Sequence, residues 1–141
     1  MDQPELDAVE HARALRGLGR INRVSRSAAI LWPAISGLAG GSVDEPMRVL
    51  DLACGGGDVP IALARRAARG GLNVQIEGCD VSPVAVQFAR VAAAEGGVPV
   101  RFFERDALHD PIPEGYDVVM CSLFLHHLGE DEAVGLLRNM A

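Results

Sequence analysis

Three aspartates and a run of glycines have the residue types and spacing expected of a ligand-binding site. Asp51 precedes the glycines at 55–57, while Asp80 and Asp106 follow the next two apolar runs of the chain. Glycine lacks a Cβ, so its backbone can adopt positive φ values and touch a ligand. A carboxylate accepts two hydrogen bonds, as many as the ribose hydroxyls of a nucleoside donate. These residues predict a nucleoside site; the structural alternatives are a plain turn at 55–57 and a helix cap at Asp80.

The elements that must position these residues begin at Met47, where short apolar runs start to alternate with helical stretches. This alternation is typical of βαβ units and a parallel sheet. We expect strands at 48–53, 73–79, 100–104 and 116–121, and helices at about 59–69, 83–96 and from 130 to the end. Right-handed crossovers place the carboxyl ends of all strands at one edge, where ligands bind.

Local signals predict how two of these helices begin. Asp58 follows the glycines and could cap the first helix, since aspartate is a favoured N-cap residue. Ser82 precedes Pro83 and is better placed than Asp80 to cap the second helix. Asp80 is therefore expected to remain available for a ligand.

Residues 1–46 have a different pattern from the rest of the chain. Apolar residues at steps of three and four predict helices over 5–18 and about 22–38, with Pro33 kinking or splitting the second. We expect a helical segment over 1–46, followed by an α/β domain over 47–141.

The composition excludes several classes of function. The 141 residues carry a net charge of −6 without a concentrated basic run, which argues against nucleic acid as a partner. The absence of lysine excludes a Walker-type phosphate loop and a Schiff base. No apolar stretch approaches the roughly 20 residues of a membrane span, and the acidic start lacks the basic region of a secretory signal. We therefore expect a cytoplasmic protein.

The three cysteines lack the close paired spacing of zinc sites. We expect Cys54, Cys79 and Cys121 to be buried thiols, and no metal site. A three-thiol metal site is the alternative.

The sequence VLDLACGGG at 49–57 resembles motif I of class I S-adenosylmethionine-dependent methyltransferases, with Ala53 in place of the first motif glycine. The stretches GCDVSP at 78–83 and RDA at 105–107 resemble the segments at the ends of the second and third strands in the same family. The resemblance implies S-adenosylmethionine as cofactor and S-adenosylhomocysteine as product. The cofactor-binding residues that it implies are Asp51, Ala53, Gly55, Gly57, Asp80, Val81, Asp106, Ala107 and Cys121. Asp106 would accept from the adenine amino group, and the Ala107 N–H would face a ring nitrogen.

The sequence CSLFLHHL at 121–128 resembles the segment after the fourth strand in ubiquinone-type small-molecule methyltransferases. The family places this segment against the cofactor sulfur and the acceptor. His126 or His127 could act as general base, since an unperturbed pKa near 6.5 suits that task. The equally weighted alternative is a pocket wall or a polar helix start. The family also suggests that 20–26 forms part of a lid over the cofactor, against the alternative of a solvated helix face.

The resemblance further implies a Rossmann-like α/β fold with flanking helices, covering roughly 47–141. The complete fold orders seven strands 3-2-1-4-5-7-6, of which this chain would supply 3-2-1-4. We expect a fragment without the C-terminal strands, whose fourth strand has an open edge that a second copy could cover.

The leading function is therefore transfer of a methyl group to oxygen or carbon of a small-molecule acceptor. A module that binds the nucleoside without turnover is one alternative. An NAD(P)-dependent oxidoreductase is another, which is disfavoured because Pro60 occupies the last position of a G-x-G-x-x-G pattern that starts at Gly55.

Overall fold

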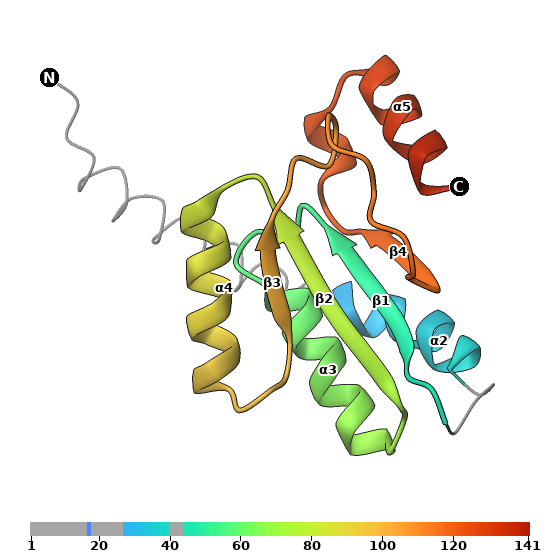
Figure 1. The fold of residues 1–141 in the computed structure, drawn as a ribbon, viewed down its shortest axis with the longest axis vertical. Coiled ribbons are helices and arrows are strands. Elements are labelled where there is room, and N and C mark those ends of the chain that lie inside the picture. The colour runs from blue at the N-terminus through green and yellow to red at the C-terminus, as the bar shows by residue number, and fades with distance from the viewer. Residues whose placement is uncertain (1–16, 18–26, 40–43) are drawn as a thin grey trace, which may run out of the picture.

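The computed structural model describes Gly17, 27–39 and 44–141, and contains a four-stranded parallel sheet with strand order β3-β2-β1-β4 (Figure 1). The strands are β1 (Met47–Leu52), β2 (Val74–Asp80), β3 (Arg101–Glu104) and β4 (Val118–Cys121). The expected α/β class and strand order are confirmed. The strand bounds differ from the expected ones by at most two residues.

Helices cover the two faces of the sheet unequally. The helices α2 (Ser27–Leu38), α3 (Asp58–Gly70) and α4 (Pro83–Glu95) contribute to the clusters on one face (Figure 1). Helix α5 (Glu130–Met140) packs on the other face through Leu136, and the short 3₁₀ helix η1 (Leu125–His127) precedes it. The three long helices of the 47–141 region match the expected ones to within one residue at every end.

The register of the sheet brings the carboxyl ends of its strands to one edge. Asp51 of β1 pairs with Gly78 of β2, and Leu52 pairs with Cys121 of β4. On the other side of β2, Asp80 pairs with Glu104 at the end of β3. The loops that follow all four strands therefore start side by side, as the sequence predicted.

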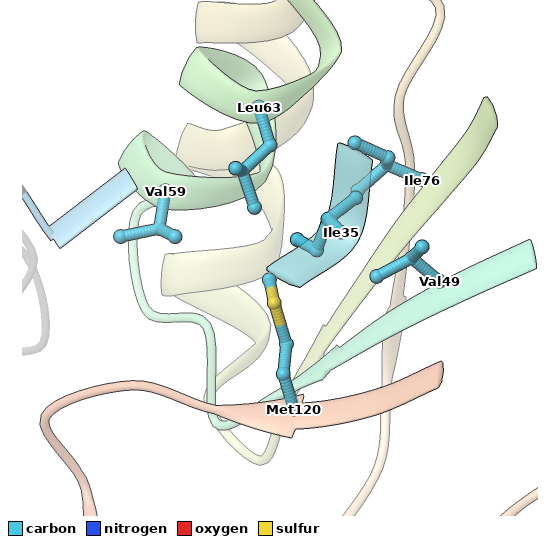
Figure 2. Packing of buried hydrophobic residues seen from close by; sticks show 6 residues of the cluster. All are labelled: Ile35, Val49, Val59, Leu63, Ile76 and Met120. Atoms are coloured by element: carbon cyan, nitrogen blue, oxygen red, sulfur yellow. The ribbon is translucent and has the colours of Figure 1, made fainter. Parts of the chain in front are cut away.

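An apolar cluster lies between the sheet and helices α2 and α3. Figure 2 shows Val49 of β1, Ile76 of β2 and Met120 of β4 facing the helices. The buried members of the cluster are Ile35, Val49, Val59, Leu63, Ile76 and Met120. Strand β1 is central and its last four residues are buried. Such two-sided burial is expected for a parallel sheet.

Pro33 lies inside α2, which continues to Leu38; of the two expected effects of this proline, a split of the helix is therefore wrong, and a kink stays a prediction. The residues on both sides of the proline contact the main core, with Ile35 buried and Trp32 packed against the same cluster. Tertiary contacts of this kind can hold a helix together across a proline, whose missing N–H removes only one hydrogen bond.

Apart from Gly17, which is helical, the parts of residues 1–46 predicted over 5–18 and 20–26 lie outside the described residues. The boundary near residue 46 stays a prediction, although α2 packs on α3 through the cluster that contains Ile35. Among the described helices, none is both long and apolar enough to cross a bilayer. The cytoplasmic location also stays a prediction.

Candidate active site

A cavity of about 190 Å³ opens at the carboxyl ends of β1 and β4. Its walls are the glycine loop, the start of α3 and the segment after β4. The lining residues are Asp51, Ala53, Cys54, Gly55, Gly56, Asp58, Val59, Ser122, Leu123, Phe124 and His127. The structure thus brings together four of the predicted site residues: Asp51, Ala53, Gly55 and His127.

Asp80 holds the glycine loop in place. The Gly55 N–H donates to Asp80 Oδ2 at 2.8 Å, and the Ser82 N–H donates to Asp80 Oδ1 at 2.9 Å. Each oxygen of the Asp80 carboxylate can accept a further hydrogen bond, so Asp80 can still accept from a ligand. The sequence argument missed this positioning role, because only the parallel pairing of β1 with β2 brings Asp80 next to Gly55.

The starts of α3 and α4 differ from each other. Ser82 caps α4, where its Oγ accepts from the Ala85 N–H at 3.3 Å, which confirms the expectation. Asp58 does not occupy the N-cap position of α3, so that expectation is wrong: the helix begins at Asp58, and Gly57 precedes it with φ of 78°. The chain enters α3 through a left-handed backbone conformation at residue 57, and this conformation favours glycine at the N-cap.

Gly57 is required by packing. A Cβ at this position would lie 2.7 Å from Phe102 Cζ and 2.8 Å from Ala89 Cβ. Gly57 is also not among the residues that line the cavity. The third glycine of the run therefore lets the loop approach β3 and α4, whereas Gly55 and Gly56 face the cavity.

Asp51 lies at the cavity with an unsatisfied hydrogen-bonding oxygen. Its side chain is buried, and Oδ1 has no partner. Burial raises the pKa of Asp51 well above its ordinary value, and the nearby Asp80 carboxylate raises it further. A buried polar atom without a partner is rare and suggests that a ligand supplies the donor.

Ala53 has φ of 51°, in the left-handed region that glycine adopts freely. This is the position where the sequence departs from the motif glycine. Ala53 therefore has a backbone conformation that glycine adopts without steric cost.

The residues after β3 form a compact turn. Asp106 Oδ1 accepts from the Leu108 N–H at 2.9 Å, and Oδ2 lies 2.9 Å from His109 Nδ1. The hydrogen bond from His109 lowers the pKa of Asp106, and the carboxylate in turn raises the pKa of His109. Ala107 is buried, whereas Val81, which directly follows β2, is 66% exposed. None of these residues lines the cavity itself.

The structure separates the two candidate histidines. His127 lines the cavity and His126 does not, although their ring centroids are 3.9 Å apart. Both belong to η1, the 3₁₀ turn that follows β4. The sequence could not choose between them because both positions fall in the same short turn.

The three cysteines are thiols at neutral pH. Burial raises the pKa of Cys79 and of Cys121 to about 11, and it raises the pKa of Cys54 further. Cys79 and Cys121 pair with Leu52 from opposite sides, so that β1 lies between them. In the described part of the chain, no group of three histidine, cysteine or acidic residues could hold a metal ion.

The α/β region of this chain is similar in sequence to known methyltransferases. The methyltransferase domain model matches residues 49–141. Demethylmenaquinone methyltransferase of Thermus thermophilus is 36% identical over 94 residues, which are 65% of this chain and 41% of that protein. Ubiquinone biosynthesis O-methyltransferase of Photorhabdus laumondii is 32% identical over 89 residues, 62% of this chain and 35% of that protein. The chain thus spans about two fifths of the length of these relatives.

Solved structures show the same fold. Magnesium protoporphyrin IX methyltransferase from Synechocystis PCC 6803, solved with bound SAH, superposes with a TM-score of 0.65 at 24% identity. The match covers 87% of this chain and 51% of that one. The parallel sheet with a glycine loop after its first strand is the Rossmann-like class of fold. Within that class, the chain belongs to the methyltransferase domain family.

Proposed function

We propose that this domain binds S-adenosylmethionine at the edge formed by β1, β2 and β4, and that it transfers the methyl group to oxygen or carbon of a small molecule. The observation that carries the proposal is the buried, unpartnered Oδ1 of Asp51 in a cavity walled by the glycine loop. The demethylmenaquinone and ubiquinone enzymes among its relatives support a small-molecule acceptor.

The described residues fit the cofactor by their chemistry. Asp51 offers a carboxyl oxygen to an ammonium group, and Asp80 has lone pairs left for ribose hydroxyls. Val81 exposes an apolar surface against which an adenine ring could pack, and Asp106 and Ala107 follow in the next loop. These assignments use the loops after three neighbouring strands.

Methyl transfer requires mainly alignment. The bound sulfonium supplies an already activated methyl group, so the protein must bring the acceptor atom into line with it. His127 is the better placed of the two histidines to accept a proton from an acceptor hydroxyl, because it lines the cavity. The ring of His126 would then lie beside that of His127.

Calorimetric titration tests the ligand class. We expect S-adenosylhomocysteine to bind more tightly than NAD, and tighter binding of NAD would contradict the proposal.

Asp80→Ala should weaken S-adenosylhomocysteine binding by roughly 1.5–3 kcal/mol, the range for hydrogen bonds to a charged group. Gln87→Ala, on the exposed side of α4, is the matched surface control and should leave the affinity unchanged. An unchanged affinity in Asp80→Ala would remove the ribose assignment.

Radiolabelled methyl transfer distinguishes the enzyme from a binding module. Turnover with any small hydroxylated acceptor would support the enzyme, whereas tight cofactor binding without turnover over a broad acceptor panel would favour the module.

We also propose that a second copy can pair with β4. This strand is at the edge of the sheet, and no strand among the described residues pairs with its outer side. Unpaired N–H and C=O groups on an edge favour pairing with another chain. Size-exclusion chromatography over a range of concentrations should show a dimer that dissociates on dilution, and a monomer at every concentration would contradict this.

A further inference from the structure

The carboxylate of Asp106, in the turn that follows β3, accepts three hydrogen bonds. Its Oδ1 accepts from the backbone N–H groups of Leu108 at 2.9 Å and of His109 at 3.3 Å. Its Oδ2 lies 2.9 Å from Nδ1 of the His109 ring. A carboxylate has about four lone-pair positions, two on each oxygen, so these contacts leave one position on Oδ2. The His109 ring therefore fixes which side of Oδ2 remains open.

The backbone places this carboxylate next to the proposed ribose site. Arg105, the residue before Asp106, donates its N–H to the Asp80 carbonyl oxygen at 3.0 Å. Asp106 itself donates its N–H to Asp110 Oδ2 at 3.0 Å, which closes the turn from its other end. The side chain of Asp106 is 36% exposed, so a ligand can still reach it. The turn thus begins beside Asp80 and carries an accessible carboxylate.

The His109 ring is not part of the hydrophobic core. Its side chain is 78% exposed, and the residue belongs to none of the hydrophobic clusters. We propose that His109 is a positioning residue, which holds Asp106 so that the open lone pair of Oδ2 accepts from the adenine amino group of the cofactor. This inference rests on the proposed methyltransferase function and adds a residue that lies outside the motifs of the sequence.

Neighbouring acidic groups favour the form of the ring that donates from Nδ1. The hydrogen bond to Asp106 and the charge of that carboxylate raise the pKa of His109, and Glu132 of α5 and Asp110 raise it further. Both nitrogens of a protonated imidazole donate, whereas the neutral ring donates from only one of them. The same hydrogen bond lowers the pKa of Asp106 and so keeps its carboxylate ionised. The pair therefore combines a charged acceptor with a donor that orients it.

Calorimetry with two ligands tests this role in the 141-residue chain. The ligands are S-adenosylhomocysteine and its 6-deamino analogue, in which a hydrogen atom replaces the adenine amino group. We expect His109→Ala to raise the Kd for S-adenosylhomocysteine by about two- to fivefold, the range that exposed charged pairs contribute. The Kd for the analogue should stay within about 1.5-fold, because a ligand without that donor gains nothing from an oriented carboxylate.

His109→Asn tests the contact between the two side chains. The asparagine amide can donate to Asp106 as the ring nitrogen does, so this variant should bind S-adenosylhomocysteine more tightly than His109→Ala. Glu114→Ala is the matched control, because Glu114 is also exposed in the connection between β3 and β4. It should leave the Kd for both ligands within about 1.5-fold of the unchanged chain, as expected for a surface substitution away from special contacts.

Three results would overturn the inference. An equal loss of affinity for both ligands in His109→Ala would show that the ring only stabilises the turn. The same loss in His109→Asn as in His109→Ala would exclude the hydrogen bond as the cause. Equal binding of both ligands by the unchanged chain would show that the amino group is not recognised.

The unchanged chain also reports on the proposed function separately. Its failure to bind S-adenosylhomocysteine would contradict both proposals. Normal binding with the same Kd in His109→Ala would contradict only the role of His109.

Discussion

Asp51 shows how the environment of a single residue prepares the site. Its carboxyl group is 2% exposed, and one oxygen lacks a partner. Burial, followed by the charge of Asp80, raises the pKa of Asp51 well above its ordinary value. A carboxyl group in this state is easier to ionise when a cationic ligand group arrives beside it. In the proposed function, Asp51 would therefore favour binding at the expense of the stability of the free domain.

We expect Asp51→Asn to be more stable than the unchanged chain at neutral pH. The pKa of Asp51 is higher in the folded than in the unfolded chain, where it is about 3.9. The folded state therefore binds more protons, and the contribution of Asp51 to stability is lost as pH rises from the unfolded pKa through the folded one. Asn removes this loss, so the free energy of unfolding at pH 7 should rise by at least about 1 kcal/mol.

Urea unfolding of both proteins between pH 3.5 and 8 measures this difference, which should shrink toward the acidic end. The variant should also bind S-adenosylhomocysteine more weakly. A variant that is less stable by the same amount at every pH would contradict the assignment, because it would indicate lost packing without any contribution from ionisation.

At the scale of elements, the loop from β1 to α3 is shaped from two sides. Asp80, from the end of β2, accepts from the Gly55 N–H on the cavity side. A Cβ at residue 57 would clash with the side chains of Phe102 in β3 and Ala89 in α4. The loop is thus placed by the neighbouring strands and helix as well as by its own glycines.

Gly57→Ala should destabilise the domain by about 2–5 kcal/mol, which combines the cost of a left-handed alanine with that of overpacking. Gly135→Ala is the matched control, since nothing lies within 4 Å of the added Cβ and the position is helical. That control should be neutral or stabilising by up to about 1 kcal/mol. Chemical denaturation measures both, and equal effects of the two substitutions would disprove the packing role of Gly57.

At the scale of the whole molecule, a polar cluster joins segments that are far apart in sequence. Glu77 of β2 is 2% exposed, and its Oε2 accepts from the Tyr116 hydroxyl at 2.5 Å. Gln75 Nε2 donates to Glu77 Oε1 at 3.0 Å, and Arg48 Nη2 of β1 lies 3.5 Å from the same oxygen. The Arg48 guanidinium also lies over the Tyr116 ring. The cluster ties the segment before β4 to the two central strands.

Tyr116→Phe should lower the free energy of unfolding by about 1–3 kcal/mol, because it leaves a buried Glu77 oxygen without its donor. Burial and the hydrogen bond to Glu77 raise the pKa of Tyr116 to about 12, so the hydroxyl keeps its proton and the loss should be constant from pH 6 to 9. A double-mutant cycle with Glu77→Gln isolates the pair. A coupling energy near zero would show that the contact contributes nothing.

The amino-acid sequence by itself determined the elements of the α/β region and the chemistry at their ends. Apolar runs and helix signals located the strands and helices of this region to within two residues at every bound, because local periodicity and capping carry that information. Ser82 was recognised as a cap for this reason. The resemblance of 49–57 to a methyltransferase motif supplied the strand order, which apolar patterning alone does not specify.

Only the tertiary structure decided where each predicted site residue lies and what it contacts. It separated the glycines that face the cavity from Gly57, which packs against Phe102, and it gave Asp80 a role in holding the loop. It placed His127 rather than His126 in the cavity wall. These features depend on contacts between segments that pair across the sheet, so no local pattern of residues could contain them. Burial, as with the pKa of Asp51, likewise exists only once those segments have come together.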